Sequence, residues 1–126
     1  MRGRDAAALA ADYAPDALKF DLAPPLQNVG VDAGGLQAWL DGFDGEIDYA
    51  VTDLAVTTSD DATLAYCHSL NRLSSTPHGA NFRFTLWYRA TLCLRQTDDG
   101  WQITHEHNST PFYMDGSLKA ATDLAP

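Results

Sequence analysis

From residue 46 to residue 108, apolar and polar side chains alternate with a period of two, and only short turn or loop segments interrupt this alternation. The period is typical of β-strands, whose successive side chains point to opposite faces of a sheet. Four long strands that follow one another along the chain are expected to pair as an antiparallel meander. The pattern predicts strands at 46–58, 63–73, 81–96 and 101–108, a loop at 74–80 and a hairpin turn at 98–100.

The first of these strands changes parity in its middle. Before Asp53 the apolar residues have odd numbers, Ile47, Tyr49 and Val51. After Asp53 they have even numbers, Leu54 and Val56. Such a change within one strand indicates a β-bulge, and bulges bend and twist a sheet. We therefore expect a strongly curved sheet.

The first third of the chain has a different pattern. An Ala-rich stretch from Asp5 to Tyr13 favours a short helix, and residues 17–22 resemble a strand that ends before two prolines. Asp32 is a suitable N-cap for a second helix, because a stripe of apolar residues with helical spacing follows it, from Leu36 to Phe43. A further short helix is expected near 117–123. The whole chain, 1–126, is then one α+β domain with helices on the concave side of the sheet.

Composition excludes several classes of function. The formal net charge is −9, which disfavours nucleic acids and anionic membrane surfaces, since both bind proteins through cationic side chains. No run of 18 apolar residues and no secretory signal occur, so a cytoplasmic protein is expected. Cys67 and Cys93 both lie in strand-like segments and are expected to be free thiols in a reducing compartment.

Four segments of the chain carry a recognisable combination of residues: 20–26, which follows 13–17, then 87–91, 99–107 and 111–117. Together they resemble the SnoaL-like branch of the nuclear transport factor 2 superfamily, which is related to ketosteroid isomerases. The resemblance implies a cone-shaped α+β barrel that opens at one end to an apolar pocket and is usually dimeric. The superfamily contains isomerases, dehydratases, cyclases, epoxide hydrolases and non-catalytic association domains. Its members usually begin with a longer helix than the few residues before Asp5 allow, so a short first helix or a less enclosed pocket is expected.

Asp21 is the first candidate for chemistry. Its position resembles that of the general-base aspartate of ketosteroid isomerases, and its neighbours in sequence are apolar. A carboxylate beside an apolar pocket can act as a proton acceptor near neutral pH, because burial disfavours its charged form. The alternative is that Asp21 only accepts backbone hydrogen bonds in the turn near the two prolines. The resemblance also implies an oxyanion hole with a second acid on the strand at 81–96, but that strand has none, so steroid isomerisation is not expected.

The last strand carries the sequence His105-Glu106-His107, in which the histidines and the glutamate point to opposite faces. Apolarity favours burial of the face with Trp101, Ile103, His105 and His107. Comparison with the isomerase and association-domain relatives favours the face with Gln102, Thr104, Glu106 and Asn108. Inward histidines would be an acid/base pair, whereas an inward Glu106 would join Asp21 as a second carboxylate. No metal site is expected, and a structural role for the histidines at a dimer contact is the other alternative.

Five further residues are candidates for substrate binding. Tyr66 and His68 share one face of their predicted strand, and Trp87 and Arg89 share one face of the next. An arginine on an apolar strand suits a carboxylate or enolate, although an internal ion pair is the alternative. His68 on a strand face also fits a hydrogen-bonded core residue. The substrate-binding candidates are Tyr66, His68, Trp87, Arg89 and His105.

Two functions fit these patterns. The first is a small cofactor-free enzyme that removes a proton next to a carbonyl of a small hydrophobic substrate, with isomerase, dehydratase or cyclase outcomes. Asp21 would be the base, His107 or Glu106 the second acid/base group, and Arg89 or Tyr66 the stabiliser of an enolate. The second is a non-catalytic ligand-binding or association module of the same fold. A homodimer is expected in both cases.

Overall fold

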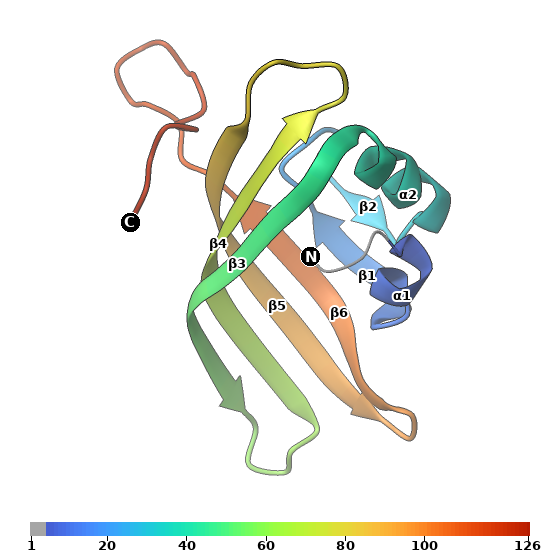
Figure 1. The fold of residues 1–126 in the computed structure, drawn as a ribbon. Helices are drawn as coiled ribbons and strands as arrows, with labels where there is room; N and C mark the ends of the chain where they lie inside the picture. Colours follow the sequence, from blue (N-terminus) through green and yellow to red (C-terminus); the bar gives the residue numbers. More distant parts are fainter. Residues whose placement is uncertain (1–4) are drawn as a thin grey trace.

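A single curved sheet of six strands forms the body of the protein (Figure 1), in a computed structural model that describes residues 5–126. The strands lie in the order β2-β1-β6-β5-β4-β3. β1 runs parallel to β6, and all other neighbouring pairs are antiparallel. The predicted α+β class and the meander of four long strands are therefore confirmed. The elements are α1 (Ala6–Ala10), β1 (Tyr13–Phe20), β2 (Asn28–Val29), α2 (Ala33–Asp41), β3 (Phe43–Thr58), β4 (Leu64–Pro77), β5 (Phe84–Thr97) and β6 (Gly100–Ser109).

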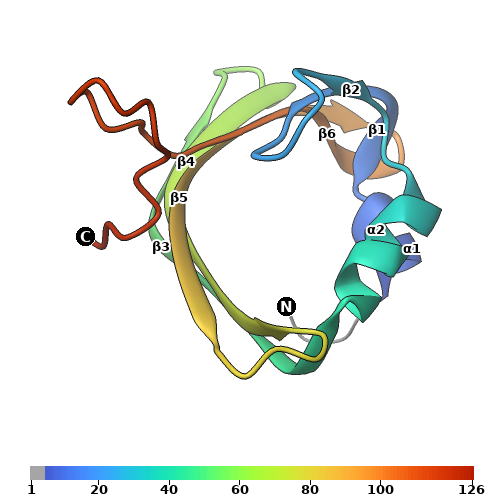
Figure 2. The same ribbon diagram turned by 90° about the horizontal axis from the view of Figure 1, so that it is seen from above.

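The sheet bends so far that, seen from above, it has the outline of a C, and α1 and α2 lie across the open side of that C (Figure 2). We name the sheet face toward the helices the inner face and the opposite one the outer face. Leu40 of α2 is fully buried and packs with Ile47 and Leu73 of the inner face. Tyr49 and Tyr88 pack against this core from the same face. The hydrophobic core thus lies between the helices and one end of the sheet.

Several register shifts interrupt the ladders of this bent sheet, among them two bulges, at Asp53 and at Thr104. At the predicted bulge, Asp53 has a φ of 53°, and the β3–β4 register shifts between Thr52 and Ala55. The second lies in β6, where Ile103 pairs with Leu94 but His105 pairs with its neighbour Cys93, so Thr104 is the extra residue. The sequence pattern did not indicate this second bulge.

The second bulge decides which side chains of β6 face inward. The sequence predicted that alternate residues of this strand share one face along its whole length. The bulge at Thr104 changes which residues alternate inward, so each predicted set is divided between the two faces. The inner face carries Glu106 and Asn108, as the comparison with relatives suggested, together with Trp101 and Ile103 from before the bulge.

The helix predicted at 5–13 is shorter than expected, and the strand predicted at 17–22 begins earlier, since β1 is Tyr13–Phe20. α1 ends at Ala10, and the backbone then turns so that Tyr13 begins β1 and pairs with Ile103. The backbone N–H of Ile103 donates to the carbonyl of Asp12 at 2.9 Å, which fixes this early strand start. Asp32 caps α2 as predicted, because its side chain accepts from the N–H of Gly35 at 3.1 Å.

The loop predicted at 74–80 is wrong in its first half. β4 continues to Pro77, and the hydroxyls of Ser74 and Thr85 lie 2.7 Å apart across the strands. Strands on both sides pair with this part of β4, and these ladders outweigh the turn-forming character of its serines.

The helix predicted near 117–123 is also wrong. Residues 111–126 instead form a hairpin-like arm, in which Phe112 and Ala120 make an isolated β-bridge. Gly116 and Leu118 have positive φ values of 87° and 56°, which a helix cannot accommodate.

Cys67 and Cys93 are free thiols, as predicted, and both are partly exposed. Cys67 pairs with Leu92 on the inner side of the sheet, whereas Cys93 pairs with Tyr66 on the outer side, so the two thiols point apart. In the part of the chain that the structure describes, no helix has the length and the apolar character that spanning a bilayer requires.

Candidate functional site

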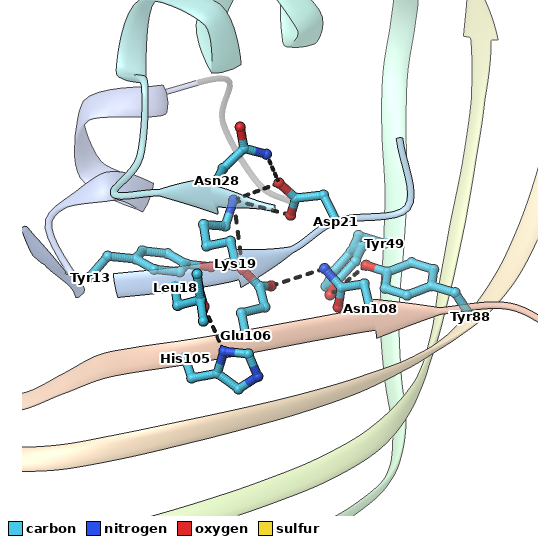
Figure 3. Close-up of polar contacts among 10 residues, drawn as sticks. All are labelled: Tyr13, Leu18, Lys19, Asp21, Asn28, Tyr49, Tyr88, His105, Glu106 and Asn108. Carbon is cyan, nitrogen blue, oxygen red and sulfur yellow. Dashed lines mark hydrogen bonds and ion pairs between the residues drawn. The ribbon is translucent and has the colours of Figure 1, made fainter. Parts of the chain in front are cut away.

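Asp21 follows β1 directly and shares a polar cluster with the lysine two residues before it (Figure 3). The Lys19 ammonium lies 3.3 Å from Asp21 Oδ1 and 3.5 Å from Asp21 Oδ2. The side-chain amide of Asn28, from the neighbouring strand β2, donates to Asp21 Oδ2 at 3.1 Å. Because the period of a strand is two, Lys19 and Asp21 lie on one face and Phe20 on the other.

Glu106 lies on the far side of the same lysine. Its Oε2 atom accepts from the Tyr13 hydroxyl at 2.7 Å and lies 3.9 Å from the Lys19 ammonium. Its other oxygen accepts from the amide of Asn108 at 3.3 Å. The Glu106 side chain is only 16% exposed, so these two hydrogen bonds and the nearby ammonium replace most of its hydration.

Tyr13 is held in its protonated form. Burial, together with the charge of the Glu106 carboxylate that its hydroxyl contacts, raises the pKa of Tyr13 far above that of an ordinary phenol. The neutral hydroxyl therefore acts as a fixed hydrogen-bond donor to Glu106.

A second group of hydroxyl and amide side chains continues from this cluster toward β4 (Figure 3). The Tyr49 oxygen accepts from the Asn71 amide at 2.8 Å and from the Tyr88 hydroxyl at 3.2 Å. Burial, followed by the hydrogen bond with Tyr88, raises the pKa of Tyr49. The Oδ1 atom of Asn108, between the two groups in Figure 3, is buried and has no hydrogen-bond partner among the described residues.

A cavity of about 430 Å³ opens beside Asp21, between the segment that joins β1 to β2 and the start of α2. This volume lies within the range of small-molecule sites, roughly 300–1,000 Å³. The Lys19–Asp21–Asn28 cluster lines one part of the cavity, and Asp32 adds a further carboxylate among prolines, valines, glycines and Leu36. The other lining residues are Pro24, Pro25, Val29, Gly30, Val31, Asp32, Gly35 and Leu36.

The three residues predicted to be catalytic are divided between the two faces. Asp21 and Glu106 are brought together on the inner side, with Lys19 between them. His107 lies on the outer face, where its ring packs edge-on against Phe20 at 5.3 Å between ring centroids.

The five predicted substrate-binding residues all lie on the outer face, away from Asp21. His105 packs against Phe20, and its Nδ1 atom lies 2.7 Å from the carbonyl oxygen of Leu18. Trp87 and Arg89 line a separate groove of about 210 Å³ beside the C-terminal residues. Tyr66 and His68 lie on the same face by their register with Cys93 and Thr91.

Sequence reasoning missed Lys19 and Tyr13. The spacing of Lys19, two residues before Asp21 in a predicted strand, could have indicated their contact, because such residues share a face. Tyr13 could not be found in this way, because the predicted first helix included it. Its contact with Glu106 spans 93 residues and depends on the parallel pairing of β1 with β6.

Asp21, Lys19 and Asn28 place a carboxylate, a cation and an amide donor at the cavity, whereas Glu106 contacts Lys19 but does not line the cavity. Asp21 and Glu106 supply two negative charges and Lys19 one positive charge, so the ionised cluster carries a net charge of −1. Within residues 5–126, no three His, Cys, Asp or Glu side chains are grouped so that they could hold a metal ion. A carboxylate next to an ammonium can in principle accept a proton and stabilise an anion.

Two solved structures share the fold of this chain at low sequence identity. A ketosteroid isomerase-like protein from Erwinia carotovora atroseptica aligns with a TM-score of 0.62 and 19% identity, over 84% of this chain and 81% of that one. An NTF2-like protein with a cystatin-like fold from Novosphingobium aromaticivorans aligns with a TM-score of 0.61 and 17% identity, over 93% and 74%. At these identities the likeness shows the fold alone.

Two comparisons show the family. An NTF2-like protein of unknown function from Pseudomonas putida aligns with a TM-score of 0.81 and 31% identity, over 98% of this chain and 84% of that one. A comparison with curated proteins finds no match. The sequence profile of the SnoaL-like domain matches residues 1–113, nearly the whole chain. With this match and the curved sheet described above, the chain belongs to the family of SnoaL-like domains.

Proposed function

We propose that this protein is a cofactor-free acid/base enzyme that removes a proton next to the carbonyl group of a small hydrophobic substrate. The observation that carries this proposal is the position of Asp21, a carboxylate that lines a cavity of small-molecule size and lies next to the Lys19 ammonium. An isomerase, a dehydratase or an aldol-type cyclase would each begin with this step. The prolines, valines and Leu36 of the wall suit an uncharged, apolar substrate body.

In the proposed step, the Asp21 carboxylate takes a proton from the carbon next to the substrate carbonyl. The electron pair of that C–H bond moves onto the carbonyl oxygen, so an enolate forms while Asp21 becomes neutral. The negative charge of the cluster is transferred to the enolate and does not increase. The Lys19 ammonium is then released from half of its ion pairing and can stabilise the enolate oxygen.

Glu106 and Tyr13 act on Lys19 rather than on the substrate. Glu106 lies 3.9 Å from the ammonium and does not exchange a proton with the substrate in this step, so Lys19 keeps one partner throughout. The Tyr13 hydroxyl at 2.7 Å in turn fixes Glu106. These two are positioning residues in this proposal.

The experiment is solvent-deuterium exchange into small ketones, with cyclohexanone and acetophenone as probes, followed by proton NMR. A positioned general base contributes about 10²–10⁴-fold to a rate, so Asp21→Asn should lower the protein-catalysed exchange by about a hundredfold or more. Asp16→Asn is the matched control, because Asp16 lies on the same strand and is exposed. Equal exchange by the wild type and Asp21→Asn, with both folded, would refute the assignment of the base.

A non-catalytic ligand-binding module is the second candidate, and one observation favours it. Both oxygens of Asp21 already have partners, Lys19 and Asn28, as expected for a structural carboxylate. In that case phenols, which mimic an enolate, would raise the melting temperature of the protein while no deuterium exchange occurs. A ligand at 100 times its dissociation constant stabilises the folded state by about 2.7 kcal/mol, which a thermal shift detects easily.

A further inference from the structure

One margin of the sheet, formed by β3, is long. Among the strands that the structure describes, β3 pairs only with β4, so its other side is a sheet edge (Figure 1). β3 has 16 residues, whereas β2 at the opposite margin has 2. An edge strand presents backbone N–H and C=O groups that no neighbouring strand satisfies. We name the side of β3 that faces away from β4, from Glu46 to Thr58, the β3 edge.

The β3 edge also exposes apolar side chains. Val51 is 48% exposed, Leu54 58% and Val56 62%. They remain exposed because the core that α2 covers lies at the other end of the sheet. A strand added to this edge would cover them, because side chains of paired strands lie about 4.5–5.5 Å apart on a shared face.

The charge of this region is strongly one-sided. Residues 41–61 contain seven of the 17 acidic residues of the chain and no lysine or arginine. Glu46, Asp53 and Asp60 are exposed and form no ion pair with another described residue. Arg83 donates to the backbone carbonyl of Glu46 at 3.3 Å, so it leaves the carboxylate of that residue unpaired. The β3 edge is therefore acidic and favours a cationic partner.

The acidic and apolar side chains at the start of the β3 edge point to opposite faces. Ile47 belongs to the core on the inner face, and Val51 follows it with the period of the strand. Glu46 and Asp48 alternate with these residues and point to the outer face. A strand paired with this part of β3 would contact apolar side chains on one face and carboxylates on the other.

We propose that the β3 edge binds an extended segment of another protein, in which cationic and apolar side chains alternate, as a further strand of the sheet. The backbone of this segment would satisfy the N–H and C=O groups of the edge. Its apolar side chains would lie beside Val51, Leu54 and Val56, and its lysines or arginines beside the carboxylates. None of the residues that line the Asp21 cavity belongs to β3, so this binding site goes beyond the proposed catalytic function and does not depend on it.

The same charge argues against a second copy of this chain at the β3 edge. Two such edges would bring the seven acidic residues of one copy close to the seven of the other. Like charges opposite one another destabilise paired strands, and charged side chains and bulges commonly protect an edge from self-association. A cationic segment is attracted by the charges that keep two copies apart.

The test is fluorescence anisotropy with a labelled synthetic peptide that alternates lysine and valine over about nine residues, the length of a long strand. The peptide should bind the wild-type protein, and binding should weaken as the salt concentration rises. A peptide that alternates glutamate and valine should bind at least about tenfold more weakly. In NMR spectra of the protein, the lysine peptide should shift mainly the amide signals of β3.

A modified peptide separates strand pairing from simple charge attraction. N-methyl groups on two adjacent central residues block one position on each edge of the peptide and keep its charge. They should weaken binding by about tenfold or more, because strand addition needs the backbone donors. Equal binding of the methylated and unmethylated peptides would overturn the proposal, since charge alone would then explain the binding.

A triple variant tests the acidic side chains of this region. Glu46→Gln, Asp53→Asn and Asp60→Asn together should weaken binding about three- to tenfold, since each exposed ion pair contributes little. Asparagine tolerates the φ of 53° at position 53, so circular dichroism should show a folded protein.

The matched control removes three exposed acidic charges elsewhere, one on β1 and two in the turn between β5 and β6. It should bind the lysine peptide nearly as tightly as the wild type. Equal affinities of the two triple variants, or no binding of the lysine peptide to the wild type, would contradict the proposed site. The control substitutions are Asp16→Asn, Asp98→Asn and Asp99→Asn.

Discussion

Replacement of Tyr13 by phenylalanine tests the polar cluster on the inner face most directly. The variant removes one hydroxyl, which donates to the Glu106 carboxylate at 2.7 Å, and leaves the ring in place. Glu106 is only 16% exposed, so solvent cannot fully replace the lost donor. Hydrogen bonds to charged groups contribute about 1.5–3 kcal/mol. We therefore expect Tyr13→Phe to lower the free energy of unfolding by about 2 kcal/mol at neutral pH, measured by urea denaturation.

Tyr113→Phe is a matched control within the same chain. The Tyr113 hydroxyl also contacts a carboxylate, that of Asp123, but this pair is exposed on the arm. Exposed substitutions usually change stability by less than about 0.5 kcal/mol. Equal effects of Tyr13→Phe and Tyr113→Phe, measured with unchanged m-values, would show that burial of Glu106 does not strengthen its hydrogen bond.

For Tyr13→Phe we also expect a change in how stability depends on pH under alkaline conditions. The pKa of Tyr13 is raised in the folded state by burial and by Glu106, relative to the ordinary value of 10.0 in the unfolded chain. Above pH 10, the unfolded chain releases this proton while the folded protein retains it, so stability falls as the pH rises. Each such tyrosine contributes a slope of about 1.4 kcal/mol per pH unit. This slope is about half developed at pH 10 and nearly complete at about pH 11, so over that range Tyr13→Phe should lose stability less steeply than the wild type by about 0.7–1.3 kcal/mol per pH unit. Parallel slopes would contradict the assignment.

Two further variants test the packing around the site. Leu40→Ala removes a fully buried side chain from the core beneath α2 and should cost about 2–5 kcal/mol in urea denaturation; a cost below 1 kcal/mol would mean that the core is not tightly packed there. Gly30→Ala would place a Cβ atom 2.8 Å from the Pro15 carbonyl at a φ of +72°, whereas Gly79→Ala has a similar φ of +74° and no atom within 4 Å. Gly30→Ala should therefore cost at least about 1 kcal/mol more than Gly79→Ala, and equal costs would contradict the close approach at the cavity wall.

The local features of this fold follow from neighbouring residues in the sequence. The alternation from residue 46 to 108 predicted the four meander strands, because period two commits side chains to alternate faces. The parity change at Asp53 predicted the bulge in β3. Asp32 predicted the start of α2, because an N-cap depends only on residues within one turn.

Strand ends and the C-terminal arm required tertiary structure. Ser74 and Ser75 have turn-forming character by themselves, but strands on both sides pair with them and hold them in β4. Gly116 and Leu118 take positive φ values within the hairpin-like arm, although their surroundings suggested a helix.

The sequence identified Asp21 and Glu106 as candidates for acid/base chemistry, one just after a strand and one within another. Only the tertiary structure decided that they share Lys19. The bulge at Thr104 reverses the parity of β6 and thereby turns Glu106 inward and His107 outward. The parallel pairing of β1 with β6 then brings Lys19 opposite Glu106, across 87 residues of chain. A one-residue change of register moves a side chain to the other face of a sheet, and such a register depends on partners distant in the sequence.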